Sequence, residues 1–289
     1  ESLRNELVAT VDDVKQTVMV VLVISCRQNI DRRNAIRETW VKLGNHEQFK
    51  YYFVIGSLQM SEEHLNSLKA ENETHQDLLL LSNVKDNYSS LTHKVLAAFQ
   101  WIQRCVQFQY VLKVDDDSFV RIDAVLNELL ERKKVRTKLF WGYFDGRASV
   151  KRKGQWKEDH WFLCDRYLPY AIGGGYVLSS DLVRFIAENG DSFQMYTSED
   201  VSVGVWLSPL KVDRVHDPRF DTEFESRGCS NRYLITHKQS VREFHKKYQN
   251  LINFGKLCDT EYVYRNAYQY NWRVPASQCC VRNLSLITT

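Results

Sequence analysis

Short apolar runs alternate with longer amphipathic or polar stretches through the first half of the chain. The apolar runs predict buried strands at residues 18–25, 51–55, 77–81 and 110–114. The stretches between and after them have helical spacing and predict helices at residues 31–43, 61–72, 90–107 and 122–134. Such β-α-β-α alternation indicates a parallel, doubly wound sheet, in which ligands bind at the carboxyl ends of the strands.

The second half of the chain is less regular. It predicts strands at residues 139–143, 175–178 and 232–236, and helices at residues 180–189 and 198–207. We find no internal repeat and no linker rich in proline, glycine or serine, and the chain has only four prolines. One continuous domain is therefore predicted.

Composition narrows the class of protein. Of the 289 residues, 44% are hydrophobic and 12% aromatic, so the chain is able to bury a full core and is not a disordered polymer. The net charge of +3 argues against a nucleic-acid-binding protein, whose binding surface is strongly basic.

Cysteines and glycosylation signals indicate the secretory pathway. None of the seven cysteines forms a CxxC pair, which argues against a zinc ribbon or a thioredoxin-type site. Asn72 and Asn283 begin sequons for N-glycosylation, and the sequence leaves open whether Asn87 is also modified. The adjacent cysteines Cys279 and Cys280 near the end predict a tail that disulfides attach to the body. Because the count is odd, at least one thiol stays unpaired within the chain.

Three consecutive carboxylates, Asp115, Asp116 and Asp117, follow the apolar strand at residues 110–114. They repel one another unless a cation or hydrogen-bond donors lie between them. Oxygen ligands of this kind suit Mg²⁺ or Mn²⁺, which substrate phosphates then complete. The alternative is an acidic turn that caps the helix after Ser118.

A second candidate group is basic and lies on the first predicted helix. Arg33 and Arg37 are four residues apart and share a face, so with Arg32 they could clamp a diphosphate. The alternative is a solvated helix face on which Asp31 and Glu38 neutralise the arginines.

Glu199 and Asp200 stand in the first turn of the helix predicted after Ser198. Acids are common there because they stabilise the helix dipole. The functional alternative is a general base, held ionised by the dipole, that takes a proton from an acceptor hydroxyl.

Glycines and aromatic residues are candidates for contact with a sugar. Three glycines at residues 173–175 precede a strand, and they allow either close approach of a ligand or a bulge at a sheet edge. Tryptophans and tyrosines cluster between Trp141 and Tyr170, where they could stack on sugar rings or pack in the core.

Two histidines could supply an imidazole to a cation. His237 ends a predicted strand, and His216 lies in a turn before Asp217 and Pro218. A structural role is the alternative for each.

Five motifs occur in an order that resembles the β-1,3-galactosyltransferase family, and they cover about residues 18–237. They are RNAIRETW at 33–40, DNYSSLTHK at 86–94, VLKVDDDSF at 111–119, GGGYVLS at 173–179 and EDVSVG at 199–204. Four further segments are similar to the branch that adds the second galactose of the glycosaminoglycan linker. These segments are HDPRFDTE at 216–223, SRGCSN at 226–231, THKQS at 236–240 and SQCC at 277–280.

The resemblance implies a Rossmann-like GT-A fold, UDP-galactose as donor, Mn²⁺, a site in the Golgi lumen and inversion at the anomeric carbon. The implied reaction is β-1,3 transfer of galactose to galactosyl-β-1,4-xylose on a proteoglycan core protein. Two alternatives remain: a β-1,3-N-acetylglucosaminyltransferase of the same family, and a non-catalytic carbohydrate-binding protein on the same fold.

The resemblance also implies roles for individual residues. Asp115 and Asp117 would frame the metal and diphosphate, with Asp116 near the ribose, and His237 is preferred to His216 as the imidazole. Asp200 would be the catalytic base. Arg33, Arg37, Asp86, Tyr88 and Lys94 would line the nucleotide pocket, and Gly174, Gly175, Glu199 and Trp161 would contact the donor or acceptor sugar.

The expected domain plan follows from the same resemblance. Residues 1–16 would be a stem remnant and residues 17–289 the catalytic domain, with a nucleotide half at about 17–120, an acceptor half at about 121–240 and a tail at 241–289. The membrane anchor of a type II protein is expected to lie outside this sequence, since its longest apolar run, residues 18–24, is too short to span a bilayer. The candidates for disulfides are Cys164, Cys229, Cys258, Cys279 and Cys280, while Cys26 and Cys105 belong to no recognised motif.

Overall fold

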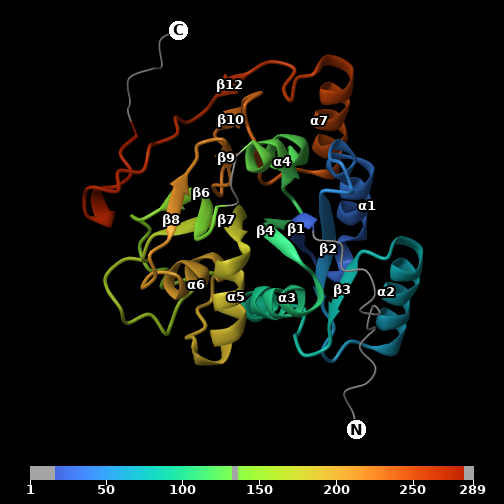
Figure 1. The fold of residues 1–289 in the computed structure, drawn as a ribbon, viewed down its shortest axis with the longest axis horizontal. Helices are drawn as coiled ribbons and strands as arrows, with labels where there is room; N and C mark the ends of the chain where they lie inside the picture. Colours follow the sequence, from blue (N-terminus) through green and yellow to red (C-terminus); the bar gives the residue numbers. More distant parts are fainter. Residues whose placement is uncertain (1–16, 132–135, 283–289) are drawn as a thin grey trace.

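A seven-stranded sheet forms the centre of the computed structural model, which describes residues 17–131 and 136–282 (Figure 1). The strand order is β3-β2-β1-β4-β7-β6-β8. The bounds are β1 Thr17–Ile24, β2 Phe49–Gly56, β3 Leu78–Leu81, β4 Phe108–Asp115, β6 Leu139–Asp145, β7 Tyr170–Ser179 and β8 Asp213–His216. The residues in the middle of β1 and β4 are almost wholly buried, as expected for strands covered on both faces.

The sheet is mixed, which corrects the predicted parallel sheet. Strands β3, β2, β1 and β4 are parallel, but β7 runs antiparallel to both β4 and β6. The connection from β6 to β7 contains no helix, and a parallel return normally needs such a crossover element. The result is a Rossmann-like parallel half joined to a mixed half, in which β7 is antiparallel and β8 pairs parallel with β6. This agrees with the α/β, GT-A class that the resemblance implies.

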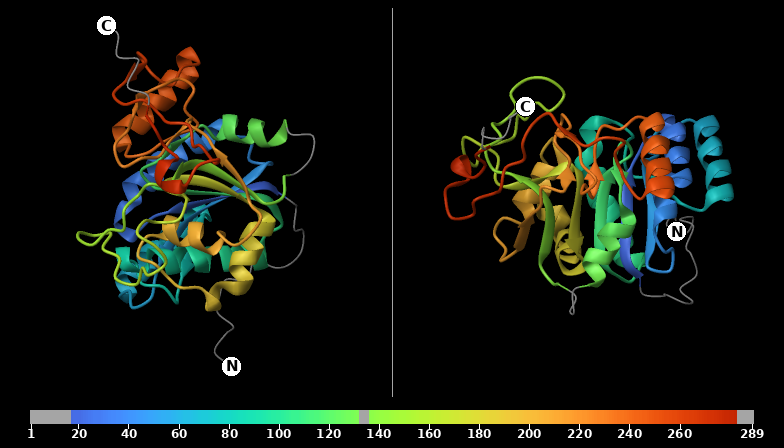
Figure 2. Two further views of the ribbon diagram at one scale, coloured as in Figure 1. Left: turned by 90° about the vertical axis from the view of Figure 1, so that its left-hand side faces the viewer. Right: turned by 90° about the horizontal axis from the view of Figure 1, so that it is seen from above.

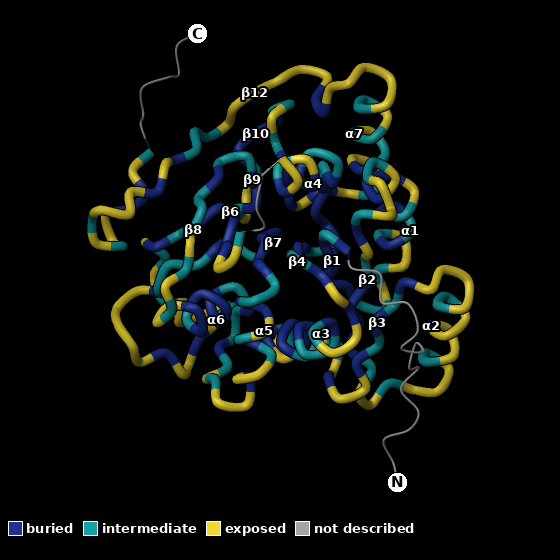
Figure 3. The backbone as a smooth tube through the Cα atoms, in the orientation of Figure 1, coloured by how far each residue is buried: buried dark blue, intermediate teal, exposed yellow. Residues whose placement is uncertain are grey.

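Helices cover both faces of the sheet (Figures 1 and 2). Helices α3, α5 and α6 pack together on one face, and α1 and α7 contact each other on the other. The bounds are α1 Ile30–Glu38, α2 Glu62–His75, α3 Leu91–Cys105, α4 Ile122–Leu130, α5 Ser180–Asn189, α6 Glu199–Trp206 and α7 Val241–Phe254. Figure 3 shows that the buried residues follow the sheet and the inner sides of these helices.

Most predicted elements are present, with shifted ends. The first helix begins after Asn29, not at Asp31, and it ends at Glu38 because the chain continues as a 3-10 turn at Trp40–Leu43. Helix α4 ends at Leu130, and residues 132–135 lie outside the described residues. Helix α7 and strand β8 have no counterpart among the predicted elements.

A small three-stranded sheet brings the second half of the chain back to the end of β4. It joins β5 (Phe119–Val120), β11 (Ile235–Thr236) and β9 (Phe220–Asp221). Strand β11 pairs antiparallel with β5 and parallel with β9. The residues after β9 and β11 therefore lie next to the acidic triplet between β4 and β5.

The tail is attached by one disulfide, not by the predicted cysteine pair. Cys229 bonds Cys258, and the short strands β10 (Gly228–Cys229) and β12 (Tyr262–Val263) pair beside it. Cys279 and Cys280 bond each other, so they do not staple the tail to the body. Cys164 is exposed and forms no disulfide with any cysteine in the chain.

Three expectations concern the chain's surface and ends. Asn72 lies on α2, where its side-chain oxygen accepts a hydrogen bond from the Leu78 amide at 2.9 Å. The Asn283 sequon and the stem expected at residues 1–16 lie outside the described residues. Within the described ranges, every helix is too short or too polar to cross a membrane.

Candidate functional site

A cleft of about 540 Å³ opens where β4 and β7 meet the start of α6. Its lining includes Asp115, Glu199, Asp200 and His237, which the sequence singles out. Residues from the loop between β6 and β7 and from the segment after β9 complete the walls. The cleft thus lies at the carboxyl end of β4, as the switch-point rule predicts.

Asp115, Asp117 and His237 converge at one end of this cleft. The His237 Nε2 atom lies 3.0 Å from Asp117 Oδ1 and 3.4 Å from Asp115 Oδ2. Backbone hydrogen bonds hold the histidine in place: its amide donates to the Asp221 carbonyl at 3.0 Å, and the Gln239 amide donates to the Asp117 carbonyl at 2.8 Å. One ligand atom from each of the three residues falls within 4.8 Å of the others.

The same group fits a divalent cation. Asp117 Oδ1 and both ring nitrogens of His237 are buried and make no hydrogen bond within the described part of the chain. Burial alone would lower the pKa of His237, but the two facing carboxylates raise it to about 9. A cation would replace that proton, since carboxylate oxygens and imidazole are suitable ligands for metals such as Mn²⁺. These three residues could therefore hold a metal.

Asp116 points away from this group toward the loop after β1. Its carboxylate accepts hydrogen bonds from Ser25 Oγ at 2.7 Å, Asn29 Nδ2 at 2.8 Å and Arg32 Nη1 at 2.8 Å. Arg32 also lies 3.9 Å from Asp117. Arg32 is thus the arginine of the first helix that reaches the acidic triplet.

Arg33 and Arg37, the predicted diphosphate clamp, are paired with carboxylates and lie outside the cleft lining. Arg33 is fully buried and donates to both carboxylate oxygens of Glu71, at 2.7 and 2.6 Å. Arg37 donates to Glu71 and, through two nitrogens, to Asp77. These paired guanidinium groups hold α1 to α2 and to Asp77, the residue before β3.

Asp86, Lys94 and Tyr88 have different environments. Asp86 pairs with Lys94, whose ammonium also donates to the Ser25 carbonyl at 3.0 Å, and Asp86 accepts from the Arg27 amide at 3.1 Å. This pair orders the loop after β1. Tyr88 lines the cleft, and burial together with Asp200 and Glu199 raises its pKa. Only Tyr88 of the three reaches the cleft directly.

Lys113 is a site residue that the sequence analysis does not single out. It is buried in β4, where its ammonium contacts Asp115 at 2.8 Å, the Gly173 carbonyl at 2.6 Å and the Glu199 carboxylate. Burial raises the pKa of Glu199 to about 7 although Lys113 opposes the change. Tyr176 donates to the other oxygen of Glu199 at 2.8 Å. A lysine inside an apolar strand is the signal that identifies such a residue.

Asp200 lies at the start of α6 with its carboxylate toward β7. One oxygen accepts from the Gly173 amide and the other from the Val201 amide, both at 2.8 Å. Burial raises the pKa of Asp200, and Lys113 and these amides limit the rise. A cleft carboxylate with a raised pKa, fixed by backbone amides, is suited to accept a proton.

The glycine run lies inside β7, not before it. A Cβ atom on Gly174 would come within 2.7 Å of the His237 ring, so glycine is needed for the metal-side histidine to pack there. Gly175 packs against Ile235 in the same way and is absent from the cleft lining. The structure thus gives Gly175 a packing role, and its contact with a sugar stays a prediction.

Trp161 is likewise a packing residue. It is 5% exposed, it packs edge-on against Tyr167 and at a tilt against Tyr196, and its ring nitrogen donates to the Cys164 carbonyl at 2.6 Å. The aromatic residues that line the cleft are Trp156 and Phe224, together with Tyr88, Tyr167 and Tyr170. Trp156 belongs to the cluster between Trp141 and Tyr170, but its sequence position does not separate it from the packed members.

Both ring nitrogens of His216 have hydrogen-bond partners on the backbone, in contrast to those of His237. Its Nδ1 accepts from the Phe144 amide at 3.1 Å, and its Nε2 faces the Tyr268 carbonyl at 2.9 Å. Burial lowers the pKa of His216 to about 4. The preference for His237 as the imidazole beside the carboxylates therefore agrees with the geometry.

Comparison with curated proteins shows similarity over most of the chain. Mouse beta-1,3-galactosyltransferase 6 is 47% identical over 268 residues, which cover 91% of this chain and 82% of that protein. UDP-GalNAc:beta-1,3-N-acetylgalactosaminyltransferase 2 of Xenopus laevis is 31% identical over 194 residues. That match covers 67% of this chain but only 39% of the relative.

Solved structures are more distant. A mannosyltransferase from Pyrobaculum calidifontis, in complex with GDP-mannose and Mn²⁺, matches with a TM-score of 0.43 and 10% identity. The matched region covers 70% of this chain and 55% of the solved chain. The family model described as galactosyltransferase matches residues 31–218, a range that includes the acidic triplet and Asp200. This chain belongs to the galactosyltransferase family.

Proposed function

We propose that this chain is an inverting β-1,3-galactosyltransferase that uses UDP-galactose. Membership of the family implies a nucleotide-sugar donor and a glycan acceptor. The proposed acceptor hydroxyl is the 3-hydroxyl of galactose in galactosyl-β-1,4-xylose of the proteoglycan linker. The 47% identity to mouse beta-1,3-galactosyltransferase 6 supports this linkage and donor.

One observation carries the proposal: two residues of the candidate metal group, Asp115 and His237, line the same cleft as the candidate base. Asp115 and His237 stand at one end, and Asp200 lies across β7 from them. A base on the side opposite the diphosphate favours direct displacement with inversion.

The proposed mechanism assigns separate tasks to these side chains. Asp200 accepts the proton of the acceptor hydroxyl. The acceptor oxygen bonds to the anomeric carbon of galactose as the bond from that carbon to the diphosphate breaks and UDP leaves. Lys113 and the Gly173 amide hold Glu199 and Asp200 in position. Asp115, Asp117 and His237 would hold Mn²⁺, which when bound neutralises charge that develops on the leaving diphosphate.

Location and extent are part of the same proposal. We place the enzyme in the Golgi lumen as the luminal part of a type II membrane protein, with residues 17–289 as the catalytic domain. The Cys229–Cys258 disulfide supports an oxidising compartment, because such bonds persist there.

The donor sugar has one specific competitor. A relative named for UDP-GalNAc transfer is 31% identical, so an N-acetylhexosamine donor is the alternative to test. Purified protein with Mn²⁺ and galactosyl-xyloside should release UDP from UDP-galactose faster than from UDP-GalNAc or UDP-GlcNAc. The product should carry a β-1,3 linkage by NMR. Preference for either N-acetylated donor would overturn the proposed donor.

A further inference from the structure

One wall of the cleft has no task in the proposed chemistry. Residues 222–225, which follow β9, line the cleft together with Gln155 and Trp156 of the loop between β6 and β7. We call residues 222–225 the β9 wall. The metal-binding group, Lys113 and Asp200 come from other elements, so the β9 wall is available for a different contact.

An aromatic pair forms the outer part of this wall. Phe224 is 63% exposed, and its ring packs edge-on against Trp156 with a centroid distance of 5.5 Å and an interplanar angle of 85°. A large apolar side chain that stays exposed at the wall of a cleft indicates a contact surface for a ligand. Aromatic faces of this kind stack on the apolar face of a sugar ring.

Two unpaired polar atoms lie beside the aromatic pair. Thr222 is fully buried, and its hydroxyl has no hydrogen-bond partner within the described ranges. The Oε2 atom of Glu223 is also buried without a hydrogen bond, although it faces Arg227 Nε at 3.4 Å. Buried polar groups without partners are costly, so their presence at a cleft wall points to a ligand that supplies hydroxyl groups.

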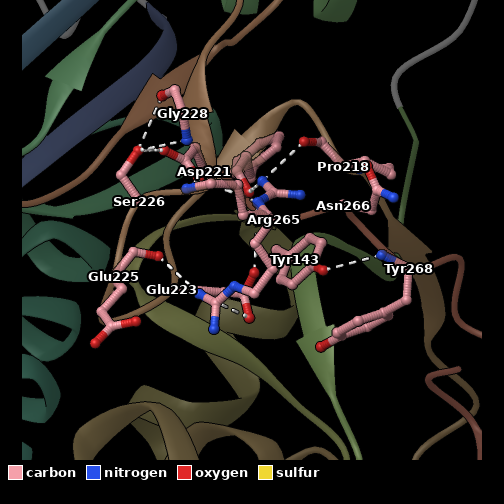
Figure 4. A network of polar contacts seen from close by, with 12 residues as sticks. Tyr143, Pro218, Asp221, Glu223, Glu225, Ser226, Gly228, Arg265, Asn266 and Tyr268 are labelled. Atoms are coloured by element: carbon pink, nitrogen blue, oxygen red, sulfur yellow. Dashed lines mark hydrogen bonds and ion pairs between the residues drawn. The ribbon is translucent and has the colours of Figure 1, made fainter. Parts of the chain in front are cut away.

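The tail holds this wall in position. Figure 4 shows Arg265 between Glu223 and Glu225, and its Nη2 donates to the Glu225 carbonyl at 2.9 Å. Arg282 pairs with Glu223 Oε1, and Arg265 lies 3.7 Å from the same atom. Both arginines come after Cys258, the residue that the disulfide bonds to Cys229. The tail therefore orders a binding surface as well as covering the body.

From this arrangement we propose that the β9 wall and Trp156 form the subsite for the second sugar of the acceptor. The ring of that sugar packs against Phe224 and Trp156, whose rings stand nearly perpendicular, and its hydroxyls bind Thr222 and Glu223. The sugar that reacts lies between this subsite and Asp200. The inference rests on the proposed function and adds which side chains hold the second sugar of the acceptor.

Two substitutions test the subsite without disturbing the fold. Phe224→Ala removes an exposed ring, and Thr222→Val removes a hydroxyl that makes no bond while keeping the side chain's shape. Each variant should raise KM for galactosyl-β-1,4-xyloside about threefold to tenfold. KM for methyl β-galactoside and the hydrolysis of UDP-galactose without acceptor should stay as in the wild type, because neither needs the second sugar.

Matched controls come from the same chain. Phe162 is 77% exposed and lies outside the cleft lining, so Phe162→Ala controls for loss of an exposed ring. Thr236 is buried, has an unpartnered hydroxyl and also lies outside the lining, so Thr236→Val controls for Thr222→Val. Both controls should keep the wild-type KM for the disaccharide.

The outcomes separate this inference from the proposed function. Unchanged KM for the disaccharide in both Phe224→Ala and Thr222→Val, or equal rises for the two acceptors, would overturn the subsite while transfer itself stands. Slower donor hydrolysis in these variants would also overturn it, since the wall would then contact the donor. If the wild type transfers galactose to neither acceptor, the proposed function fails and the subsite falls with it.

Discussion

Two charged clusters in this molecule are built from similar groups but differ in how completely they are paired. The α1–α2 cluster consists of Arg33, Arg37, Glu71 and Asp77, and its buried charges are joined by close hydrogen bonds. The cleft cluster consists of Asp115, Asp117, Asp200 and His237. There, Asp117 Oδ1 and both nitrogens of His237 remain buried without a hydrogen bond.

This difference separates a structural cluster from a chemical one. In the α1–α2 cluster the guanidinium groups neutralise the carboxylates and leave few donors or acceptors for a ligand. In the cleft cluster, one ligand atom each of Asp115, Asp117 and His237 lies within 4.8 Å of the others, and Asp115 and His237 line the cleft. Charge density alone does not distinguish the two, whereas the number of unsatisfied atoms does.

The strongest test of the comparison changes the candidate base. Asp200→Asn should reduce kcat on the order of 10²–10⁴-fold, because the amide is unable to take the acceptor proton. Mn²⁺-dependent UDP binding should remain, since Asp200 is not one of the three candidate ligands. Turnover with galactosyl-xyloside and calorimetry with UDP measure the two effects.

Glu199→Gln is the partner variant in that experiment. Glu199 contacts Lys113 and Tyr176 and should affect turnover less than Asp200 does. Near-normal turnover in Asp200→Asn together with an inactive Glu199→Gln would assign the base to Glu199.

The second test opens the α1–α2 cluster. Glu71→Gln leaves Arg33 and Arg37 without their shared carboxylate charge, and a broken buried pair typically costs about 3–5 kcal/mol of unfolding free energy. Turnover per folded molecule should not change, because the cluster lies outside the cleft lining. Urea unfolding gives the free energy, with the exposed Glu63→Gln on the same helix as control.

Loss of nucleotide binding in Glu71→Gln, with little loss of stability, would contradict the comparison. Arg33 and Arg37 would then contact the nucleotide as the family resemblance implies.

The third test compares the two histidines. His237→Ala removes the ring nitrogen that lies 3.0 and 3.4 Å from two carboxylates and should weaken Mn²⁺-dependent UDP binding about tenfold or more. His216→Ala breaks two hydrogen bonds to the backbone and should lower the thermal midpoint while leaving the metal dependence unchanged. A metal titration that shows the reverse order would exchange the two roles.

The smallest expected effect is a pH dependence of stability from His216. The folded-state pKa of about 4 lies below the ordinary value of 6.5, so the unfolded chain binds the proton more tightly. The contribution of His216 is therefore complete above pH 6.5 and is lost as the pH falls toward 4. This loss should lower the free energy of unfolding by about 1 kcal/mol at pH 5.5.

The matching variant is His216→Gln, whose side chain keeps a donor and an acceptor but does not titrate there. Its unfolding free energy should fall less than that of the wild type between pH 7 and pH 5.5. Equal losses in the two proteins would show that His216 is not held neutral.

The sequence by itself determined the local features of this protein. Apolar runs located β1, β2 and β4, because a strand buried on both faces is mostly apolar. The acidic triplet after β4 pointed to the cleft because the end of a central strand is a ligand position in an α/β sheet. The ordered motifs added His237 and Asp200, whose roles as ligand and base stay predictions.

Only the tertiary structure decided which charged groups pair. Arg37 and its partner Asp77 are 40 residues apart, and Thr222 and Glu223 reach the cleft only because β9 pairs with β11. Local periodicity records whether a position is buried, but it carries no information on which distant group fills the space beside it. Charge pairing distinguished Arg32, which reaches the acidic triplet, from Arg33 and Arg37. Packing distinguished Trp156, which lines the cleft, from Trp161. The local sequence of each of these residues fits a structural role and a ligand-binding role equally well.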